Sequence, residues 1–335
     1  MVVCKSTFKL NNGKSRYFSL TACSDRHSED PASALSKPGS DDEKALEDSI
    51  IHALKAGYRL IDTAQIYGTE RAVGQAIRKS GIPRSDITVV TKFWGHWHHD
   101  PAEALRRSLA DLDVDYIDVF LMHWPWATTP EPEKKPLRKW ESPTFIETWK
   151  KMEELVGPKC RTIGVSNFTQ KTLDELLQTA KIVPAVNQVE LHALNPNLKL
   201  VPYCQEKGIV VTSWATLGGS DSETKGLILN DKLFTDIAQA HGCSTGVVSL
   251  SWAVQRGISV IPKSASKTRI EDNINLVTLS EDEMAAINGA QDKLGWHHLA
   301  KGITAQYMEV DGKPTLMTWT FQDFGWEDEE GNCLT

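Results

Sequence analysis

Four ionisable side chains lie at or just after the ends of three short apolar runs in the first half of the chain. Asp62 follows the run 58–61 and Tyr67 comes five residues later, while Lys92 and His123 end the next two runs. A carboxylate, a phenol, an ammonium and an imidazole suit the transfer of a hydride to a carbonyl, because the developing alkoxide needs a proton donor. A phenol with its ordinary pKa of about 10 exchanges protons poorly near neutrality, and a neighbouring ammonium lowers that pKa.

Each of the four residues has a role in that chemistry. Tyr67 is expected to donate the proton and Lys92 to favour the phenolate, while Asp62 keeps the lysine charged and oriented. His123 can hydrogen-bond the carbonyl oxygen and share the proton transfer. Taken singly, an Asp or Lys after a strand is more often a cap or a surface charge, and a lone histidine at a strand end is as often structural. Their joint placement is what favours catalysis.

Helical and strand patterns alternate from about residue 42 onward. The strands are brief and apolar, which is typical of parallel strands buried on both faces. Regular alternation predicts a parallel sheet. The expected strands are 58–61, 87–91, 116–122, 162–165, 185–189, 209–213 and 259–261. The expected helices are 43–55, 70–79, 102–112, 144–155, 171–180, 198–207, 232–241, 245–255, 269–275 and 281–291.

A (β/α)8 barrel needs an eighth strand, and 16–22 is the candidate that precedes the first helix. We therefore predict an α/β fold in which residues 1–335 form one TIM-barrel domain with an atypical first strand. Residues 1–41 form an atypical N-terminal segment. The stretches 23–42, 126–141 and 295–335 are expected to be loops. The last two should border the active site, which lies at the carboxyl ends of barrel strands.

The composition excludes several classes of partner. The chain has 335 residues, with 37 Lys and Arg against 44 Asp and Glu, so the net charge is −7. No basic surplus exists to neutralise the phosphates of a nucleic acid or an anionic membrane. Neither a transmembrane run nor the apolar core of a signal peptide is present. Six cysteines lie far apart, which favours reduced thiols and a cytoplasmic protein.

Six motifs in order give the chain a resemblance to a known family. They are D-T-A-Q-I-Y-G-T-E (62–70), T-K-F-W (91–94), L-M-H-W-P (121–125), I-G-V-S-N-F (163–168), V-N-Q-V-E-L-H (186–192) and I-P-K-S (261–264). Together they resemble the aldo-keto reductases, over roughly residues 43–294. F-K-L-N-N-G (8–13) resembles the N-terminal hairpin of that family. The tail F-G-W-E-D (324–328) is similar to that of fungal members of the glycerol dehydrogenase and glyceraldehyde reductase type.

The resemblance implies a (β/α)8 barrel that uses NADPH to reduce a small aldehyde or ketone. It makes Asp62, Tyr67, Lys92 and His123 the catalytic tetrad, with Tyr67 as general acid. It also implies a set of cofactor contacts. These are Ser166, Asn167 and Gln188 on the nicotinamide carboxamide, Trp214 stacked on the ring, Leu217 and Gly218 along the pyrophosphate, and Lys263, Ser264, Arg269 and Asn273 around the adenosine 2′-phosphate. Paired cations on a dianionic phosphate favour NADPH over NADH.

The remaining assignments concern the substrate side and rival motifs. Trp94 and Trp124 are predicted to line an apolar substrate pocket, with Trp97 and Trp126 as further candidates. The histidines at 96, 98 and 99 match no zinc signature, so no metal is expected, and they either edge that pocket or are solvated. Tyr203 and Lys207 spell the Y-x-x-x-K pair of short-chain dehydrogenases. The match is interpreted as chance, because no G-x-G-x-x-G phosphate loop occurs.

Residues 14–35 depart from the family pattern, which has a first strand ending in L-G-x-G-T-W. Two explanations remain open: genuine divergence with a remodelled pocket, or a mispredicted gene junction that translates intronic sequence. The departure also leaves alternatives for function. The chain could be an NADPH-binding regulatory or weakly active barrel, or a ketoreductase of secondary metabolism. A monomer and a homodimer are both compatible with the sequence.

Overall fold

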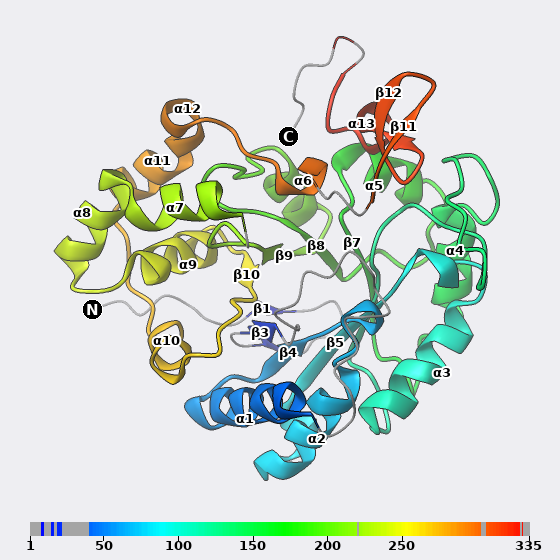
Figure 1. Cartoon of the computed structure of the whole chain (residues 1–335), viewed down its shortest axis with the longest axis horizontal. Helices are drawn as coiled ribbons and strands as arrows, with labels where there is room; N and C mark the ends of the chain where they lie inside the picture. The colour runs from blue at the N-terminus through cyan, green and yellow to red at the C-terminus, as the bar shows by residue number, and fades with distance from the viewer. Residues whose placement is uncertain are drawn as a thin grey trace.

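Eight parallel strands form the central sheet of the computed structural model (Figure 1), in the order β10-β9-β8-β7-β6-β5-β4-β3. The structure describes residues 8–9, 15–16, 19–21, 40–219, 221–302, 306–328 and 330. The strands are β3 (Ser19–Thr21), β4 (Leu60–Asp62), β5 (Thr88–Phe93), β6 (Val119–Met122), β7 (Ile163–Ser166), β8 (Val186–Glu190), β9 (Val210–Trp214) and β10 (Ser259–Val260). Each strand pairs with the next along the chain, which is the strand order of a (β/α)8 barrel and confirms the predicted fold class.

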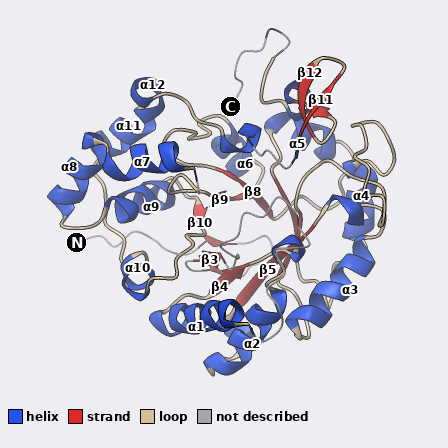
Figure 2. Cartoon of the chain, in the orientation of Figure 1, coloured by secondary structure: helices blue, strands red, loops and turns tan. Residues whose placement is uncertain are grey.

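Helices surround these strands on the outside, as the secondary-structure colouring makes clear (Figure 2). Most of the predicted helices are present with ends shifted by a few residues, and 232–241 and 245–255 coincide with α8 and α9. The helices are α1 (Asp41–Ala56), α2 (Glu70–Ser80), α3 (Pro101–Leu112), α4 (Phe145–Glu153), α5 (Gln170–Leu177), α6 (Leu200–Glu206), α7 (Ser222–Asn230), α8 (Lys232–His241), α9 (Thr245–Gln255), α10 (Lys267–Asp272), α11 (Glu281–Asn288) and α12 (Ala290–Leu294). None of the helices in the described part of the chain has the length and apolar character needed to cross a membrane.

The eighth strand lies where the sequence required it, before the first helix. Strand β3 pairs in parallel with β4, with Ser19 opposite Leu60 and Thr21 opposite Asp62. Arg16 is not part of it, because it belongs to β2 (Ser15–Arg16), which pairs antiparallel with β1 (Phe8–Lys9) as the expected N-terminal hairpin. Residues 17, 18 and 22 of the predicted strand, and 23–39 of the predicted loop, lie outside the described residues.

The C-terminal tail is not a loop, contrary to the sequence-based prediction. Strands β11 (Tyr307–Val310), β12 (Lys313–Leu316) and β13 (Trp319–Thr320) form a separate antiparallel sheet, followed by the short helix α13 (Phe321–Phe324). Asp311 and Gly312 connect the first two strands with positive φ angles of 54° and 73°. An Asp-Gly pair of this kind is a strong hairpin signal. It was the local feature that could have predicted this sheet.

Two other segments differ from the predicted pattern. Helix α7 was not predicted, and its amino end is capped by the Asp221 carboxylate, which accepts a hydrogen bond from the backbone N–H of Thr224 at 2.6 Å. An interior Gly226 weakens the helical pattern there. The predicted helix 281–291 is divided into α11 and α12 at Gly289, since glycine ends a helix more readily than other residues.

The first helices pack closely against each other. A Cβ atom on Gly74 of α2 would lie 1.8 Å from the carbonyl oxygen of Leu112 at the end of α3, so only glycine permits this approach. Between α1 and α2, the Arg71 guanidinium lies 2.7 Å from the Glu43 carboxylate. The Lys79 ammonium lies 2.8 Å from Glu47. These contacts fix α2 between α1 and α3.

A buried carboxyl group lies beneath α2. Glu70 begins this helix and is 4% exposed. The Thr91 hydroxyl donates a 2.7 Å hydrogen bond to its carboxyl oxygen. Burial raises the pKa of Glu70 to about 7, although the hydrogen bonds from Thr91 and Ser108 oppose that shift. The folded protein therefore binds a proton at Glu70 more tightly than the unfolded chain does.

This difference predicts a pH-dependent stability that Glu70→Gln should remove. Because the pKa rises from 4.5 unfolded to about 7 folded, the contribution is complete at low pH and is lost as the pH rises through about 7. Between pH 4.5 and about pH 7, the free energy of unfolding of the wild type should fall by about 3 kcal/mol relative to that of the variant. Urea denaturation at several pH values measures both. Parallel pH profiles for the two proteins would contradict the assignment.

Candidate active site

Four residues of the predicted tetrad lie at one edge of the sheet. Asp62 is the last residue of β4, Lys92 is the last residue but one of β5, and His123 directly follows β6. Tyr67 ends a short 3-10 helix, Gln65–Tyr67, in the loop between β4 and α2. Because the strands are parallel and adjacent, their carboxyl ends point the same way and bring these side chains together.

A buried ion pair stands at the centre of the site. The Lys92 ammonium donates to the Asp62 carboxylate at 2.7 Å and to the backbone carbonyl of Thr63 at 2.9 Å. Both charged side chains are essentially inaccessible to solvent. A buried charge is tolerated only when it is paired and its remaining hydrogen bonds are satisfied, which this geometry achieves. The ammonium is thereby held in one place.

The phenol ring of Tyr67 lies close to both Lys92 and His123. The Lys92 nitrogen is 5.0 Å from the centre of the Tyr67 ring. The ring centres of Tyr67 and His123 are 5.8 Å apart at an interplanar angle of 84°. The His123 ring also contacts Trp94 edge-on, with ring centres 4.9 Å apart. The half-buried Tyr67 therefore has a cation and an imidazole as immediate neighbours.

His123 is a neutral imidazole. It is 8% exposed, and burial holds its pKa well below the ordinary value of 6.5, with the Lys92 charge acting in the same direction. A neutral imidazole carries one N–H donor and one acceptor nitrogen. It can therefore hydrogen-bond a substrate oxygen, but it does not carry a positive charge near neutral pH.

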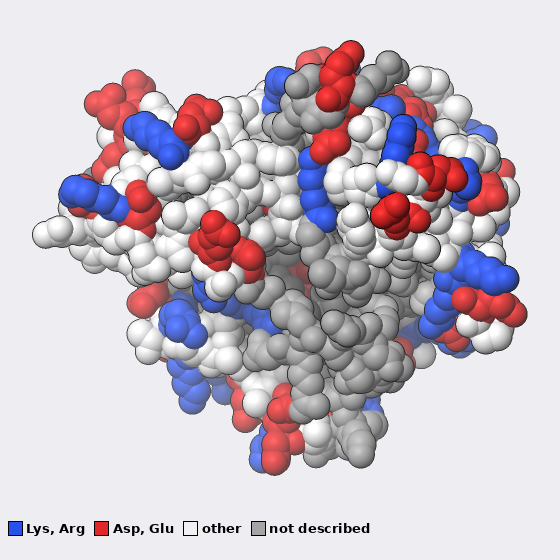
Figure 3. Space-filling view, turned by 45° about the horizontal axis from the view of Figure 1, so that its top comes forward, with Lys and Arg blue, Asp and Glu red and all other residues white. Residues whose placement is uncertain are grey.

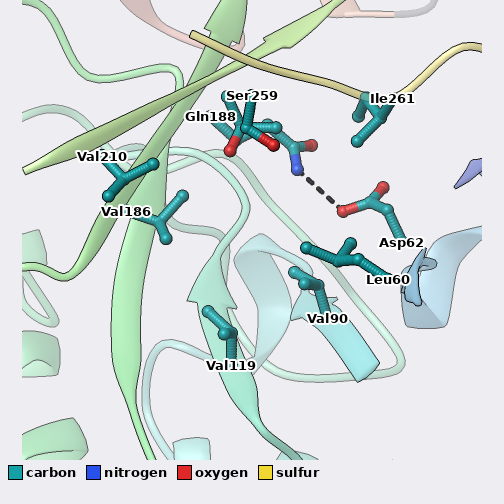
Figure 4. A pocket seen from close by; sticks show the side chains of 10 residues that line it. Leu60, Asp62, Val90, Val119, Val186, Gln188, Val210, Ser259 and Ile261 are labelled. Atoms are coloured by element: carbon teal, nitrogen blue, oxygen red, sulfur yellow. Dashed lines mark hydrogen bonds between the residues drawn. The ribbon is translucent and has the colours of Figure 1, made fainter. Parts of the chain in front are cut away.

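Gln188 connects the tetrad with the interior of the barrel (Figure 4). Its amide nitrogen donates a 2.7 Å hydrogen bond to the second carboxylate oxygen of Asp62. An ionised carboxylate only accepts hydrogen bonds, so this contact fixes which end of the Gln188 amide is nitrogen. The amide oxygen remains available as an acceptor. Apart from these two polar groups, the cavity is lined largely by apolar side chains, including Leu60, Val90, Val119, Val186, Val210 and Ile261.

Ser166, Asn167 and Trp214 form a hydrogen-bonded group next to Gln188. The Asn167 amide nitrogen donates to the backbone carbonyl of His123 at 2.9 Å and to the Ser166 hydroxyl at 3.2 Å. Its amide oxygen accepts from the Trp214 indole at 2.9 Å. The Ser166 hydroxyl in turn donates to the carbonyl of Gln188 at 2.8 Å. To donate to a carboxamide oxygen, Ser166 or Asn167 must exchange one of these bonds.

The remaining predicted cofactor residues follow the last two barrel strands. Leu217 and Gly218 lie in the loop between β9 and α7, where a Cβ on Gly218 would approach the Lys225 backbone to 2.5 Å. Lys263 and Ser264 follow β10, while Arg269 lies on α10 and the buried Asn273 caps its end. The exposed Arg269 side chain reaches the Ser264 hydroxyl at 3.4 Å.

This donor set fits an NADP(H) cofactor at its phosphate end. Lys263 and Arg269 are both exposed cations, and the Ser264 hydroxyl lies between them in sequence and in contact with the arginine. Acidic and basic side chains are interspersed on the face shown in Figure 3, which is hollowed near its centre.

The aromatic side chains form a continuous group beside His123. Trp94 is half-buried, whereas Trp124 is 3% exposed because Phe324 and Trp326 of the C-terminal segment cover it. Trp126 packs against Trp94 with ring centres 5.0 Å apart. The assignment of Trp94 and Trp124 to a substrate pocket stays a prediction. The structure adds that the C-terminal segment belongs to the same aromatic group.

His98 has a structural position, contrary to both sequence-based interpretations. It neither edges a pocket nor is solvated, since its side chain is fully buried against Phe93 and its ring nitrogen lies 3.2 Å from the Thr148 hydroxyl. Burial lowers the pKa of His98 to about 3. The sequence pattern around His98 does not by itself distinguish a solvent-exposed loop from a buried turn. In the described ranges, no group of three or more His, Cys, Asp or Glu side chains is arranged to hold a metal ion.

Glu190 is a buried charged residue at this rim that the sequence reasoning missed. It ends β8 and is 4% exposed. The rule that selected Asp62 and Lys92, a charged residue at the end of an apolar strand, applies equally to Glu190. Two of its partners, the backbone N–H groups of Leu299 and Ala300, lie more than a hundred residues away in the sequence, so its role could not be derived from local pattern.

The neutral state of His123 can be tested directly. Because burial and Lys92 both lower its pKa, the imidazole should show no protonation as the pH falls through 6.5. Nitrogen NMR of labelled histidine measures the charge. In a double variant Asp62→Asn with Lys92→Met, the pKa should rise but stay below its ordinary value, because the burial remains. A His123 that titrates near 6.5 in the wild type would contradict this description.

Comparison with known proteins gives a consistent result. The sequence model of the Aldo/keto reductase family matches residues 33–292. Glycerol 2-dehydrogenase (NADP(+)) of Saccharomyces cerevisiae is 41% identical over 74% of this chain and 83% of its own length. D/L-glyceraldehyde reductase of Hypocrea jecorina is 35% identical over 73% of this chain and 80% of its own length.

Solved structures show the same likeness. The crystal structure of a Bombyx mori aldo-keto reductase in complex with NADP superposes with a TM-score of 0.73 at 32% identity, covering 87% of this chain and 94% of that one. The aldose reductase of Schistosoma japonicum gives a TM-score of 0.74 at 29% identity, covering 88% and 95%. The strand order, the residues at the rim and these matches agree: the chain belongs to the Aldo/keto reductase family.

Proposed function

We propose that this protein is an NADP(H)-dependent oxidoreductase that reduces a small aldehyde or ketone and oxidises the corresponding alcohol in reverse. The buried Lys92–Asp62 pair with Tyr67 against it carries the proposal. Relatives named as a glycerol dehydrogenase and a glyceraldehyde reductase support a short polyol or its carbonyl form as the substrate class.

The chain supplies the proton and the orientation. Tyr67 donates its hydroxyl proton to the carbonyl oxygen as negative charge develops there. The ammonium of Lys92, held by Asp62 and the Thr63 carbonyl, stabilises the phenolate that remains. The neutral imidazole of His123 orients the carbonyl oxygen through one hydrogen bond. In alcohol oxidation the same residues act in the opposite order.

The rim of β7 to β10 is proposed to hold the cofactor. When bound, NADPH supplies the hydride. Gln188, Ser166 and Asn167 would hold the carboxamide, and Trp214 would contact the nicotinamide ring. Leu217 and Gly218 would lie along the pyrophosphate. Lys263, Ser264, Arg269 and Asn273 would hold the 2′-phosphate, where paired cations favour a dianion.

The proposal extends to the organisation of the chain. We infer that residues 1–335 act as one unit, with the tail 295–335 bordering the site. This is supported by the hydrogen bond that the Thr169 hydroxyl donates to the backbone carbonyl of Phe324. A reducing, cytoplasmic location is supported by Cys160 and Cys204, free thiols whose pKa burial raises to about 12. Either a monomer or a homodimer satisfies the mechanism.

Tyr67→Phe tests the proton donor. Removing the hydroxyl should lower kcat for glyceraldehyde by roughly 10²- to 10⁴-fold, the usual contribution of a general acid, while NADPH still binds. NADPH oxidation measures turnover and quenching of tryptophan fluorescence measures binding. The matched control is Tyr203→Phe, whose hydroxyl donates to Asp174 at 2.5 Å on the outside of the barrel, so its turnover should equal that of the wild type.

Two results would overturn the mechanism. One is a Tyr67→Phe enzyme with wild-type turnover. The other is a wild type that binds NADPH tightly but reduces none of a broad set of aldehydes and ketones, which would instead support a regulatory, cofactor-binding protein.

Arg269→Ala tests the phosphate contact. Loss of a charge-assisted hydrogen bond should weaken NADPH binding by roughly 10- to 100-fold and leave NADH binding nearly unchanged, because NADH lacks the 2′-phosphate. Arg106→Ala removes the same charge from an exposed ion pair with Glu103 on α3 and should change neither affinity. An equal loss for both cofactors would exclude Arg269 from the phosphate site.

A further inference from the structure

Glu190 is a buried carboxylate that the proposed mechanism does not use. Two backbone N–H groups of the C-terminal segment donate to it, that of Leu299 at 2.8 Å and that of Ala300 at 2.7 Å. The Asn195 amide donates at 3.3 Å. The His192 ring nitrogen Nε2 lies 3.1 Å from the same carboxylate. A strand of the barrel is thus joined to a segment more than a hundred residues later in the sequence.

The tautomer of His192 follows from its second contact. Its Nδ1 accepts the backbone N–H of Leu194 at 3.2 Å, so the proton must be on Nε2, which faces Glu190. Burial by itself would raise the pKa of Glu190, but the hydrogen bonds from the His192 ring and the Leu299 N–H act in the opposite direction, and the pKa lies below its ordinary value. The donors therefore surround an ionised carboxylate.

The segment held by Glu190 carries part of the aromatic group beside the active site. His298 immediately precedes Leu299, and its ring centre lies 4.5 Å from that of Trp326. Trp326 stacks on Phe324 at 4.3 Å and an interplanar angle of 8°. It also contacts Trp124 at 6.4 Å.

The same group continues to the tetrad. Trp124 directly follows His123 in sequence and packs against Trp126 with ring centres 6.1 Å apart. Trp126 contacts Trp94 at 5.0 Å, and Trp94 contacts His123 at 4.9 Å. A packed core transmits displacement because it leaves few voids to absorb it. Movement at His298 would consequently change the aromatic surface next to His123.

We propose that Glu190 is a positioning residue. By holding Leu299 and Ala300, it fixes His298 and Trp326. It thereby sets the shape of the aromatic wall beside His123, which consists of Trp94, Trp124, Trp126 and Trp326. The wall then determines which carbonyl compounds bind well. Aromatic aldehydes have a ring to pack on the half-buried Trp94, which the buried members of this group support from behind, whereas glyceraldehyde has no ring and depends on the tetrad. This specificity role rests on the proposed carbonyl reduction, but the contact that holds the segment can be measured without any turnover.

The primary experiment compares Glu190→Gln with the wild type by hydrogen exchange. The amide side chain has nearly the same shape but no charge, and its NH2 group faces a backbone N–H that needs an acceptor. Exchange at Leu299 and Ala300 should accelerate by roughly 10- to 100-fold, because hydrogen bonds to a charged group are lost. Glu47→Gln is the matched control, since Glu47 is 7% exposed and pairs with Lys79 on the α1–α2 interface.

The second measurement is kinetic. In Glu190→Gln, KM for benzaldehyde should rise by roughly tenfold while kcat, and both constants for glyceraldehyde, stay within about twofold. A residue that only stabilised the fold would not change one substrate selectively. Trp326→Leu should reproduce the change in KM without faster exchange at Leu299 and Ala300, because it removes the ring that packs on Trp124 and leaves the contacts of Glu190 in place.

Each outcome decides the question. Fast exchange at Leu299 and Ala300 in the wild type, as fast as at the exposed Tyr307, would overturn the anchor even if Glu190→Gln failed to fold. An equal change in KM for both aldehydes would overturn the specificity role. If the wild type reduces no carbonyl compound, the proposed function fails, yet protection of the two amides that is lost in Glu190→Gln would still support the anchor.

Discussion

The contact between Lys92 and Asp62 determines how the rest of this protein must be built. Removing two opposite charges from water costs several kcal/mol each, and the cost is offset only when the pair has close geometry and full hydrogen bonding. Adjacent strands β4 and β5 supply the geometry, and the Thr63 carbonyl and Gln188 amide supply the remaining partners. The buried pair is therefore stable only if β4 and β5 are neighbours and if Thr63 and Gln188 complete its hydrogen bonds.

That requirement links the tetrad with the proposed cofactor site. The Gln188 side chain donates to Asp62, and its backbone carbonyl accepts from the Ser166 hydroxyl. The Asn167 amide is itself held by the backbone of His123 and by the Trp214 indole. Residues from β4 to β9 thus orient one another before any ligand binds. Such preorganisation lowers the reorganisation needed during reaction.

A second buried carboxylate plays a comparable part for the C-terminal segment. The Glu190 carboxylate accepts hydrogen bonds from the backbone N–H groups of Leu299 and Ala300, in the way that an anion binds at the start of a helical turn. The small sheet β11–β13 and the helix α13 are fixed to the barrel by further contacts, such as the bond from the Thr318 hydroxyl to the Leu137 carbonyl at 2.7 Å. The loop 126–141 and the C-terminal tail are consequently in contact with each other.

The sequence by itself determined the alternation of strands and helices and the placement of Asp62, Lys92 and His123 on one rim. Both follow from local properties, since apolar runs mark buried strands and parallel strands end at the same edge. It could not determine that Gln188 contacts Asp62, that His98 is buried beside Thr148, or that Glu190 holds Leu299. These contacts join residues far apart in the chain, so they exist only once the barrel has formed and cannot be deduced from periodicity. The tail lies between the two cases, because its Asp311-Gly312 turn is a local signal while its packing on the aromatic group is not.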